Sequence, residues 1–137
     1  MSRLPLVFAL ILASCAEEQP TMPGLVAGTY EGGNRDALCI AGAAGGQRAG
    51  FIVYSPDRAN CSVSGRVEQG GSGWNLIPAG DEGCKIPLTA TAEQVSLGEP
   101  TPGCAYYCGP GAAYGGKAFK RSQAAVPVAD LAGDPLC

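Results

Sequence analysis

Apolar and polar residues alternate with a period of two through the middle of the chain. In residues 61–68, the side chains of Cys61, Val63 and Val67 share one face, and polar side chains share the other. This pattern is typical of a strand with one face buried. The run 84–92 repeats the pattern, and its core-facing side chains are expected to be Cys84, Ile86, Leu88, Ala90 and Ala92. Both cysteines are therefore predicted to face the core.

Further short runs have the composition of strands, and turn clusters rich in Gly, Pro, Ser and Asp separate them. The runs cover residues 26–31, 37–41, 50–55, 73–78 and 94–97. Turns that recur every 8 to 12 residues or so are typical of small all-β domains. The pattern predicts a mainly β fold, an antiparallel meander that closes as a barrel or a sandwich. Pro87 lacks an N–H donor, so its strand is expected at a sheet edge or broken there.

The pattern changes near the C-terminus, where residues 110–121 predict one short helix. Pro110 suits the first position of a helix, and Lys117, Lys120 and Arg121 suit the negative end of its dipole.

The N-terminal residues have the three parts of a secretory signal. Arg3 supplies a positive charge, residues 6–13 are apolar, and small residues precede a polar segment. The apolar run is far shorter than the ~20 residues that a membrane-spanning helix needs. We therefore expect the chain to be exported.

Residues Leu12, Ala13, Ser14 and Cys15 resemble the lipobox of bacterial lipoproteins. The resemblance implies cleavage before Cys15 and a diacylglycerol on its thiol, so that the membrane is a partner through the lipid. Ala16 in place of Asp implies sorting to the outer membrane, facing the periplasm. Ordinary cleavage after Ala16 is the alternative, and it would release a soluble secreted protein.

These features divide the chain into three parts. Residues 1–14 are the signal peptide, residues 15–24 are the lipidated N-terminus and a flexible tether, and residues 25–137 are a single disulfide-bonded β domain.

Six cysteines remain for pairing, and an exported chain meets conditions in which disulfides persist. A metal site is the alternative, but the spacing lacks a C-x2-C pair and the chain has no His. The pairing that we favour is Cys39 with Cys61, Cys84 with Cys104, and Cys108 with Cys137. The C-terminus is thus expected to be tied back, and no cofactor is expected.

The distal part also resembles small uncharacterised lipoproteins of alphaproteobacteria, which share a Cys-x-x-x-Cys-Gly-x-Gly-Ala element and a terminal Leu-Cys. The residues that carry the resemblance are Cys104, Cys108, Gly109, Gly111, Ala112, Leu136 and Cys137. The resemblance implies envelope location and disulfides, and it implies no activity.

Composition and charge exclude several functions. Without His, the chain has no Ser-His-Asp or Cys-His triad. A net charge of -3 gives no footprint for nucleic acid. The adjacent Asp81 and Glu82 are interpreted as residues of a solvated turn rather than as paired catalytic acids. Asp130 and Asp134 are assigned to a surface turn, because a calcium loop would need a denser set of oxygen ligands.

Aromatic residues are the candidates for a binding surface. Tyr106, Tyr107 and Tyr114 lie near the basic residues at 117–121, and Trp74 lies in a predicted strand. Packing of Tyr107 and Phe119 in the core is the alternative interpretation.

The sequence therefore predicts a lipid-anchored, non-enzymatic binding or envelope-interaction module. A specific version of this hypothesis is an inhibitor of lysozyme or of another envelope-directed hydrolase. The alternatives are a structural or assembly-accessory envelope lipoprotein and, further off, a carboxylate-based hydrolase. The partner, an envelope protein or a ligand, is not identified.

Overall fold

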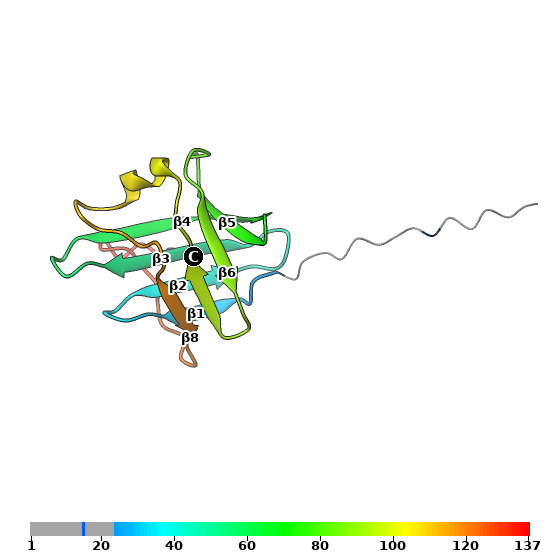
Figure 1. Cartoon of the computed structure of the whole chain (residues 1–137). Helices are drawn as coiled ribbons and strands as arrows, with labels where there is room; N and C mark the ends of the chain where they lie inside the picture. Colours follow the sequence, from blue (N-terminus) through cyan, green and yellow to red (C-terminus); the bar gives the residue numbers. More distant parts are fainter. Residues whose placement is uncertain (1–14, 16–23) are drawn as a thin grey trace, which may run out of the picture.

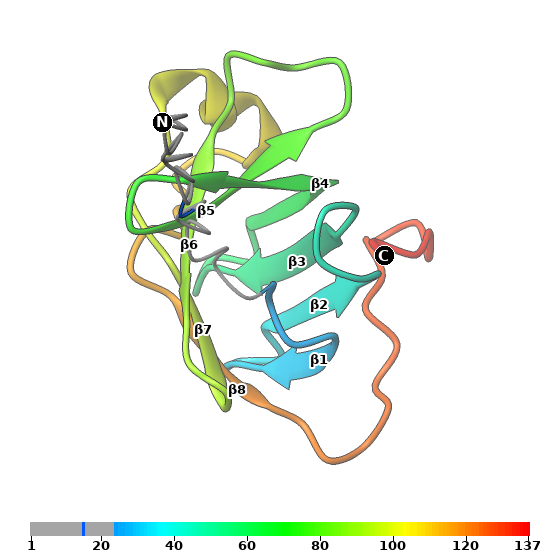
Figure 2. The same ribbon diagram turned by 90° about the vertical axis from the view of Figure 1, so that its right-hand side faces the viewer.

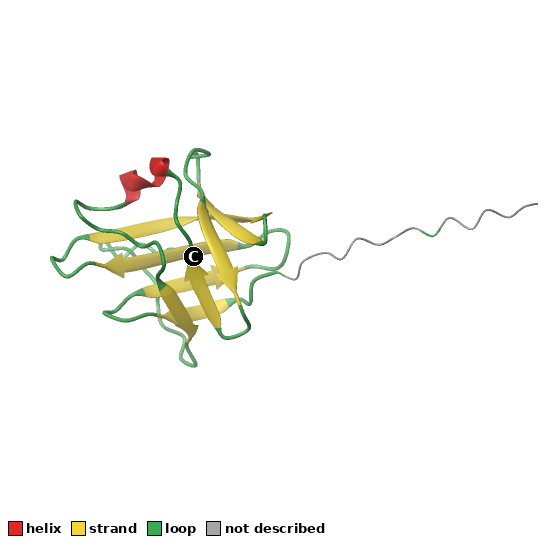
Figure 3. Cartoon of the chain, viewed as in Figure 1, coloured by secondary structure: helices red, strands yellow, loops and turns green. Residues whose placement is uncertain are grey.

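Antiparallel strands β1 to β8 close into a barrel in which each strand pairs with its neighbour in sequence and β8 pairs with β1 (Figures 1 and 3). The computed structural model describes Cys15 and residues 24–137. The strands are β1 Gly28–Glu31, β2 Ala37–Ala41, β3 Arg48–Tyr54, β4 Asn60–Gly70, β5 Gly73–Pro78, β6 Ile86–Ala90, β7 Gln94–Leu97 and β8 Ala118–Arg121. The predicted mainly β, disulfide-stapled meander is confirmed, and its form is a barrel.

The period-two pattern places one face of each strand inside the barrel. In β4, Cys61 and Val63 are buried, and Val67 packs against the core from a partly buried position. The expectation for Ala92 is wrong, because β6 ends at Ala90 and Ala92 is exposed in the turn to β7. Apolar side chains fill the interior, and the largest fully buried ones of this cluster are Tyr30, Phe51, Phe119, Leu38, Leu76, Ile86, Leu88 and Leu97.

The strand that contains Pro87 is not at an edge. β6 pairs with β5 on one side and with β7 on the other, with Pro87 opposite Asn75. The Pro87 carbonyl accepts a hydrogen bond from the Gly98 N–H at 2.8 Å. Proline lacks the backbone N–H donor but keeps its carbonyl acceptor. Pro87 is therefore tolerated near the start of β6, where its carbonyl still bonds the backbone of Gly98.

The helix predicted over residues 110–121 is absent. Residues 118–121 form β8, in which Phe119 is buried between exposed neighbours. The short helix of the described residues lies earlier, as the 3-10 helix η1, Pro102–Tyr107. Gly116 has a φ of 81°, which ends any helical path, and the pairing of β8 with both β7 and β1 satisfies its backbone groups.

Three disulfides join the described residues, and one of them matches the favoured pairing. Cys84–Cys104 is confirmed, whereas Cys39 pairs with Cys137 and Cys61 pairs with Cys108. The favoured Cys39–Cys61 bridge is wrong because the two side chains lie on opposite faces of the barrel wall. Cys61 belongs to the interior cluster, and Cys39 belongs to a smaller cluster with Ile52, Val128 and Leu136.

The C-terminal segment, residues 122–137, covers that smaller cluster from outside. Figure 2 shows it running past β1 and β2 and back toward β3. The Ser64 hydroxyl donates to the Leu136 carbonyl at 2.6 Å. A Cβ at Gly50 would collide with the same carbonyl, so glycine is needed where this segment crosses β3. The predicted tying back of Cys137 is confirmed.

The barrel has two different ends. At the distal end lie the connections 32–36, 55–59, 79–85 and 98–117. Figure 1 shows η1, which belongs to the last of them, at the upper left. At the proximal end lie the connections 42–47, 71–72 and 91–93. The chain enters at the proximal end, because the Leu25 N–H and carbonyl bond the Gln47 side chain at 2.8 and 2.6 Å.

The predicted signal peptide, and residues 16–23 of the predicted tether, lie outside the described residues. Cys15 is exposed, and among the described cysteines it alone has a free thiol. Within residue 15 and residues 24–137, the structure contains no helix long and apolar enough to cross a membrane.

Candidate functional site

The structure gives the aromatic residues that the sequence grouped as a binding surface very different exposures. Tyr106 projects from η1 with 86% of its surface exposed, and the ring of Tyr107 meets it edge to face at 5.2 Å between centroids. The Tyr107 hydroxyl donates to Asp81 Oδ2 at 2.8 Å. Burial, followed by this hydrogen bond, raises the pKa of Tyr107 to about 12. Tyr107 therefore anchors η1 to the connection 79–85, and Tyr106 is free to contact a partner.

Tyr114 closes the distal end of the barrel from inside. Only 2% of it is exposed, and its ring packs at a tilt against Phe51, with 5.0 Å between centroids. Its buried hydroxyl has no hydrogen-bond partner among the described residues. Burial, followed by the negative charge of Glu99, raises the pKa of Tyr114 to about 12. A buried side chain does not form part of the exposed surface that the sequence predicted.

Trp74 lies apart from the three tyrosines. It is the second residue of β5, beside the proximal connection 71–72, and it is partly buried against the core. Of the basic neighbours, Lys117 pairs with buried Asp36 at 3.1 Å, while β8 carries Lys120 and Arg121. The predicted aromatic and basic cluster is therefore dispersed over the barrel.

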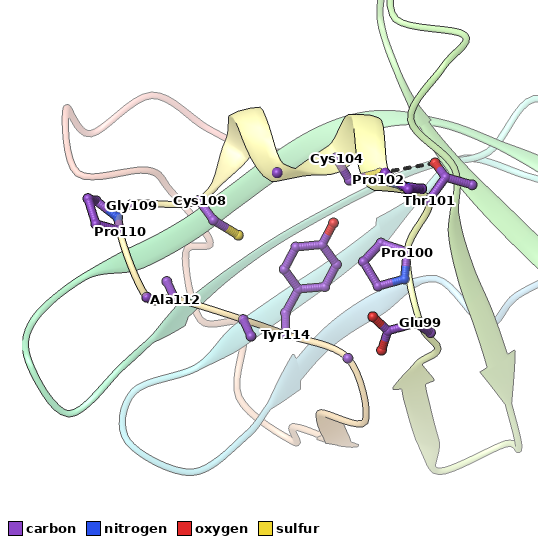
Figure 4. Close-up of a pocket in the computed structure, with 14 residues that line it drawn as sticks. Glu99, Pro100, Thr101, Pro102, Cys104, Cys108, Gly109, Pro110, Ala112 and Tyr114 are labelled. Carbon is purple, nitrogen blue, oxygen red and sulfur yellow. Dashed lines mark hydrogen bonds between the residues drawn. The ribbon is translucent and has the colours of Figure 1, made fainter.

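A first hollow lies beside Tyr114 at the distal end (Figure 4). Its volume is about 570 Å³, and we call it the proline hollow. Two of the disulfides fix its walls, because Cys104 and Cys108 line it and are bridged to Cys84 and Cys61. The other residues that line it are Glu99, Pro100, Thr101, Pro102, Ala105, Gly109, Pro110, Gly111, Ala112, Ala113, Tyr114 and Gly115.

A second hollow, of about 630 Å³, lies at the same end, and we call it the arginine hollow. Three separate segments form it: the β1–β2 turn, the β3–β4 turn and the C-terminal segment. Its lining residues are Asn34, Arg35, Tyr54, Ser55, Pro56, Arg58 and Leu131. The Arg35 guanidinium lies 4.6 Å from the centroid of the Tyr54 ring, a cation–π contact.

The backbone around the arginine hollow is held in an unusual conformation. Asn34, Arg35 and Arg58 have φ values of 56°, 70° and 71°, and in the described chain they are the non-glycine residues with positive φ. All three line this hollow. Left-handed backbone is costly for an arginine, and residues held in it concentrate at functional sites.

Within the described residues, neither Arg35 nor Arg58 forms an ion pair. The ion pairs found there are Arg66 with Glu68, Arg66 with Glu82, and Lys117 with Asp36. Asp36, at the end of the β1–β2 turn, is the nearby acid in sequence. Its Oδ2 pairs with Lys117, and its Oδ1 accepts the Tyr54 N–H at 2.8 Å. Its charge is therefore already compensated.

Sequence reasoning missed the arginine hollow. Its arginines occupy turns, and the signal that could have indicated them is the dipeptides Asn34-Arg35 and Asp57-Arg58, each in a turn between two predicted strands.

The carboxylates that the sequence singled out serve other contacts. Asp81 accepts the Tyr107 hydroxyl, and Glu82 bonds Arg66 at 2.8 Å, which lowers the pKa of Glu82. Asp130 Oδ1 accepts the N–H groups of Ala132 and Asp134 at 2.9 Å each, so this pair shapes a turn as expected. In the part of the chain that the structure describes, no three His, Cys, Asp or Glu residues gather in a way that could hold a metal ion.

Comparison with known proteins adds no relative: no protein-family model matches this chain, and neither a curated protein nor a solved structure is significantly similar to it.

Proposed function

We propose that this protein is a lipid-anchored, non-enzymatic binding module of the cell envelope, and that its distal end contacts the partner. The lipid would be carried by Cys15 and would hold the domain at the outer membrane, facing the periplasm. The partner is another envelope molecule.

The observation that carries this proposal is that the chain enters the barrel at one end and the two hollows open at the other end. Leu25 enters the barrel beside Gln47 at the proximal end, whereas the proline hollow and the arginine hollow both open at the distal end. A tether that joins the proximal end to a membrane would leave the distal end facing away from the lipid.

The distal end is also built to keep its shape. Cys61–Cys108 ties the long connection 98–117 to β4, and Cys84–Cys104 ties it to the connection 79–85. A surface that is rigid before binding loses less conformational entropy on binding. Exposed Tyr106 is an aromatic residue of the type that is enriched at protein interfaces.

Site-specific photocrosslinking in the producing cells tests the proposal. A photoreactive amino acid replaces exposed Asp57 in the distal β3–β4 turn or, as the matched control, exposed Ser72 in the proximal β4–β5 turn. We expect a discrete crosslinked species from position 57 and none from position 72.

Equal labelling at both positions, or labelling at position 72 alone, would overturn the proposal. The identity of the species captured at position 57 separates the two versions of the function. A hydrolase directed at the envelope would indicate an inhibitor, and an envelope assembly protein would indicate an accessory role.

A further inference from the structure

We propose that the arginine hollow is a binding site for an oxyanion, a carboxylate or phosphate group that its ligand carries next to an apolar moiety. The inference rests on the proposed function, because it supplies the ligand chemistry for the distal end.

The two guanidinium groups are the first element of the site. Arg35 and Arg58 come from different turns, and the residues that line the hollow with them include no acid. A guanidinium offers a planar fork of N–H donors that matches a carboxylate or phosphate with two hydrogen bonds. Two unpaired forks at one hollow therefore favour an anionic ligand.

The placement of Arg35 is partly prearranged. Its guanidinium rests against the Tyr54 ring, and the Tyr54 N–H is held by the Asp36 carboxylate. Stacking on the ring restricts the long side chain and leaves the edge of the guanidinium able to donate. Less side-chain entropy is then lost when the ligand binds.

Two of the acidic residues near the site have other partners. Asp36 is bonded by Lys117 and by the Tyr54 N–H, and Asp130 accepts a backbone N–H of its own turn. Asp57 Oδ2 lies on the side of Gly111, a residue of the proline hollow. None of these carboxylates lines the arginine hollow.

The remaining wall is apolar and accessible. Leu131 is 68% exposed at the tip of the C-terminal segment, and Pro56 lies in the opposite turn. The exposed Leu131 side chain lines the same hollow as the two arginines. The site therefore pairs charge with an apolar contact, which favours an anion attached to a ring or an aliphatic group.

The test titrates small probes into the isotopically labelled chain from residue 15 onward, with Cys15→Ser so that no lipid is attached, and follows the amide resonances. The probes are benzoate, phenyl phosphate and the neutral benzamide. We expect benzoate or phenyl phosphate to give saturable shifts at the amides of residues 34, 35, 54, 55, 57, 58 and 131. Comparison of these two probes distinguishes a carboxylate ligand from a phosphate ligand.

Variants locate the interaction. Arg35→Gln or Arg58→Gln alone should weaken binding about ten-fold, and the double variant should weaken it further, because each lost charged hydrogen bond costs about that factor. Arg48→Gln removes the same charge at the proximal end and should leave binding unchanged. The spectrum of each variant reports its folding, and either single variant replaces the double variant if the latter unfolds.

Equal binding of benzamide, unchanged binding by the double variant, or the absence of saturable shifts would overturn the inference. These results would not bear on the photocrosslinking experiment, which reports contact at the distal end whatever the chemistry of the partner. Failure of this inference is therefore distinguishable from failure of the proposed function.

Discussion

Two tyrosine hydroxyls at the distal end have opposite hydrogen-bonding states. The Tyr107 hydroxyl donates to Asp81, whereas the Tyr114 hydroxyl is buried without a partner among the described residues. A buried polar group that makes no hydrogen bond costs about 1–3 kcal/mol, and a satisfied bond contributes about 1 kcal/mol. The Tyr114 ring thus stabilises the core by packing, whereas its unsatisfied hydroxyl destabilises the fold.

Removal of each hydroxyl should therefore change stability in opposite directions. We expect Tyr114→Phe to raise the free energy of unfolding by about 1 kcal/mol, and Tyr107→Phe to lower it by about the same amount. Urea denaturation measures both changes. A loss of stability in Tyr114→Phe would show that this hydroxyl has a partner in solution.

The same two residues should make the fold sensitive to alkali. In the folded protein the pKa of each lies near 12, against about 10 in an unfolded chain. Between these values the unfolded state releases protons that the folded state retains. Their contribution is complete below about pH 10 and is lost as the pH rises toward 12.

Urea midpoints at a series of pH values between 9 and 12, together with phenolate absorbance, measure this effect, with pH steps of ~0.5. We expect the double variant Tyr107→Phe with Tyr114→Phe to show a shallower fall over this range. An unchanged slope would mean that other groups govern the alkaline transition.

At the scale of elements, the C-terminal segment acts as a strap over the outer face of β2 and β3. Cys39–Cys137 closes it, and Val128 and Leu136 pack on Ile52 beneath it. The strap carries Leu131 to the arginine hollow. The outer disulfide is thus linked to the shape of the distal end.

We expect Cys39→Ala with Cys137→Ala to release the strap and to leave the barrel folded. The loss of stability should be about 2–5 kcal/mol, the range for removal of a native disulfide. Hydrogen exchange should become fast for residues 128–136 and stay slow in β4 and β5.

The matched control is Cys84→Ala with Cys104→Ala, which removes a disulfide near η1 and should leave the strap protected. Fast exchange throughout the barrel in the first variant would contradict the separation of strap and core.

The strands were the most predictable elements. The predicted ranges 37–41, 73–78 and 94–97 coincide with β2, β5 and β7, because alternation within a strand is a local property. The helix prediction over residues 110–121 is wrong at β8, since four residues beside paired glycines carry little periodicity. Its strand state comes from pairing with β1 and β7, which are remote in sequence.

At the scale of the whole molecule, the two ends of the barrel differ. The chain enters at the proximal end, and the two hollows open at the distal end. The lipid anchor predicted at Cys15 would hold the proximal end toward the membrane and the distal end away from it. The anchor itself is open to a direct measurement.

We expect protein extracted from membranes to begin at Cys15 and to carry acyl mass on that residue, because the lipobox resemblance implies cleavage before it. Reduction should add two hydrogens for each of the disulfides Cys39–Cys137, Cys61–Cys108 and Cys84–Cys104. Cys15→Ala should move the protein out of the membrane fraction. A mature chain that begins after Ala16 without lipid would contradict the anchor.

The sequence by itself determined the β class, the inward faces of most strands and the use of six cysteines as bridges. Each of these depends on neighbours in the chain: alternation sets which side chains share a face, and the predicted export signal together with the cysteine count favours disulfide formation.

Only the tertiary structure decided which cysteines meet, how the barrel closes and where the arginines gather. Cys39 and Cys137 are 98 residues apart, and Cys39 lies in β2 whereas Cys137 follows the last strand, so local spacing does not bring them together. The arginine hollow likewise joins two turns and the C-terminal strap. Contacts between distant segments are set by the closure of the whole barrel, and a local pattern carries no record of them.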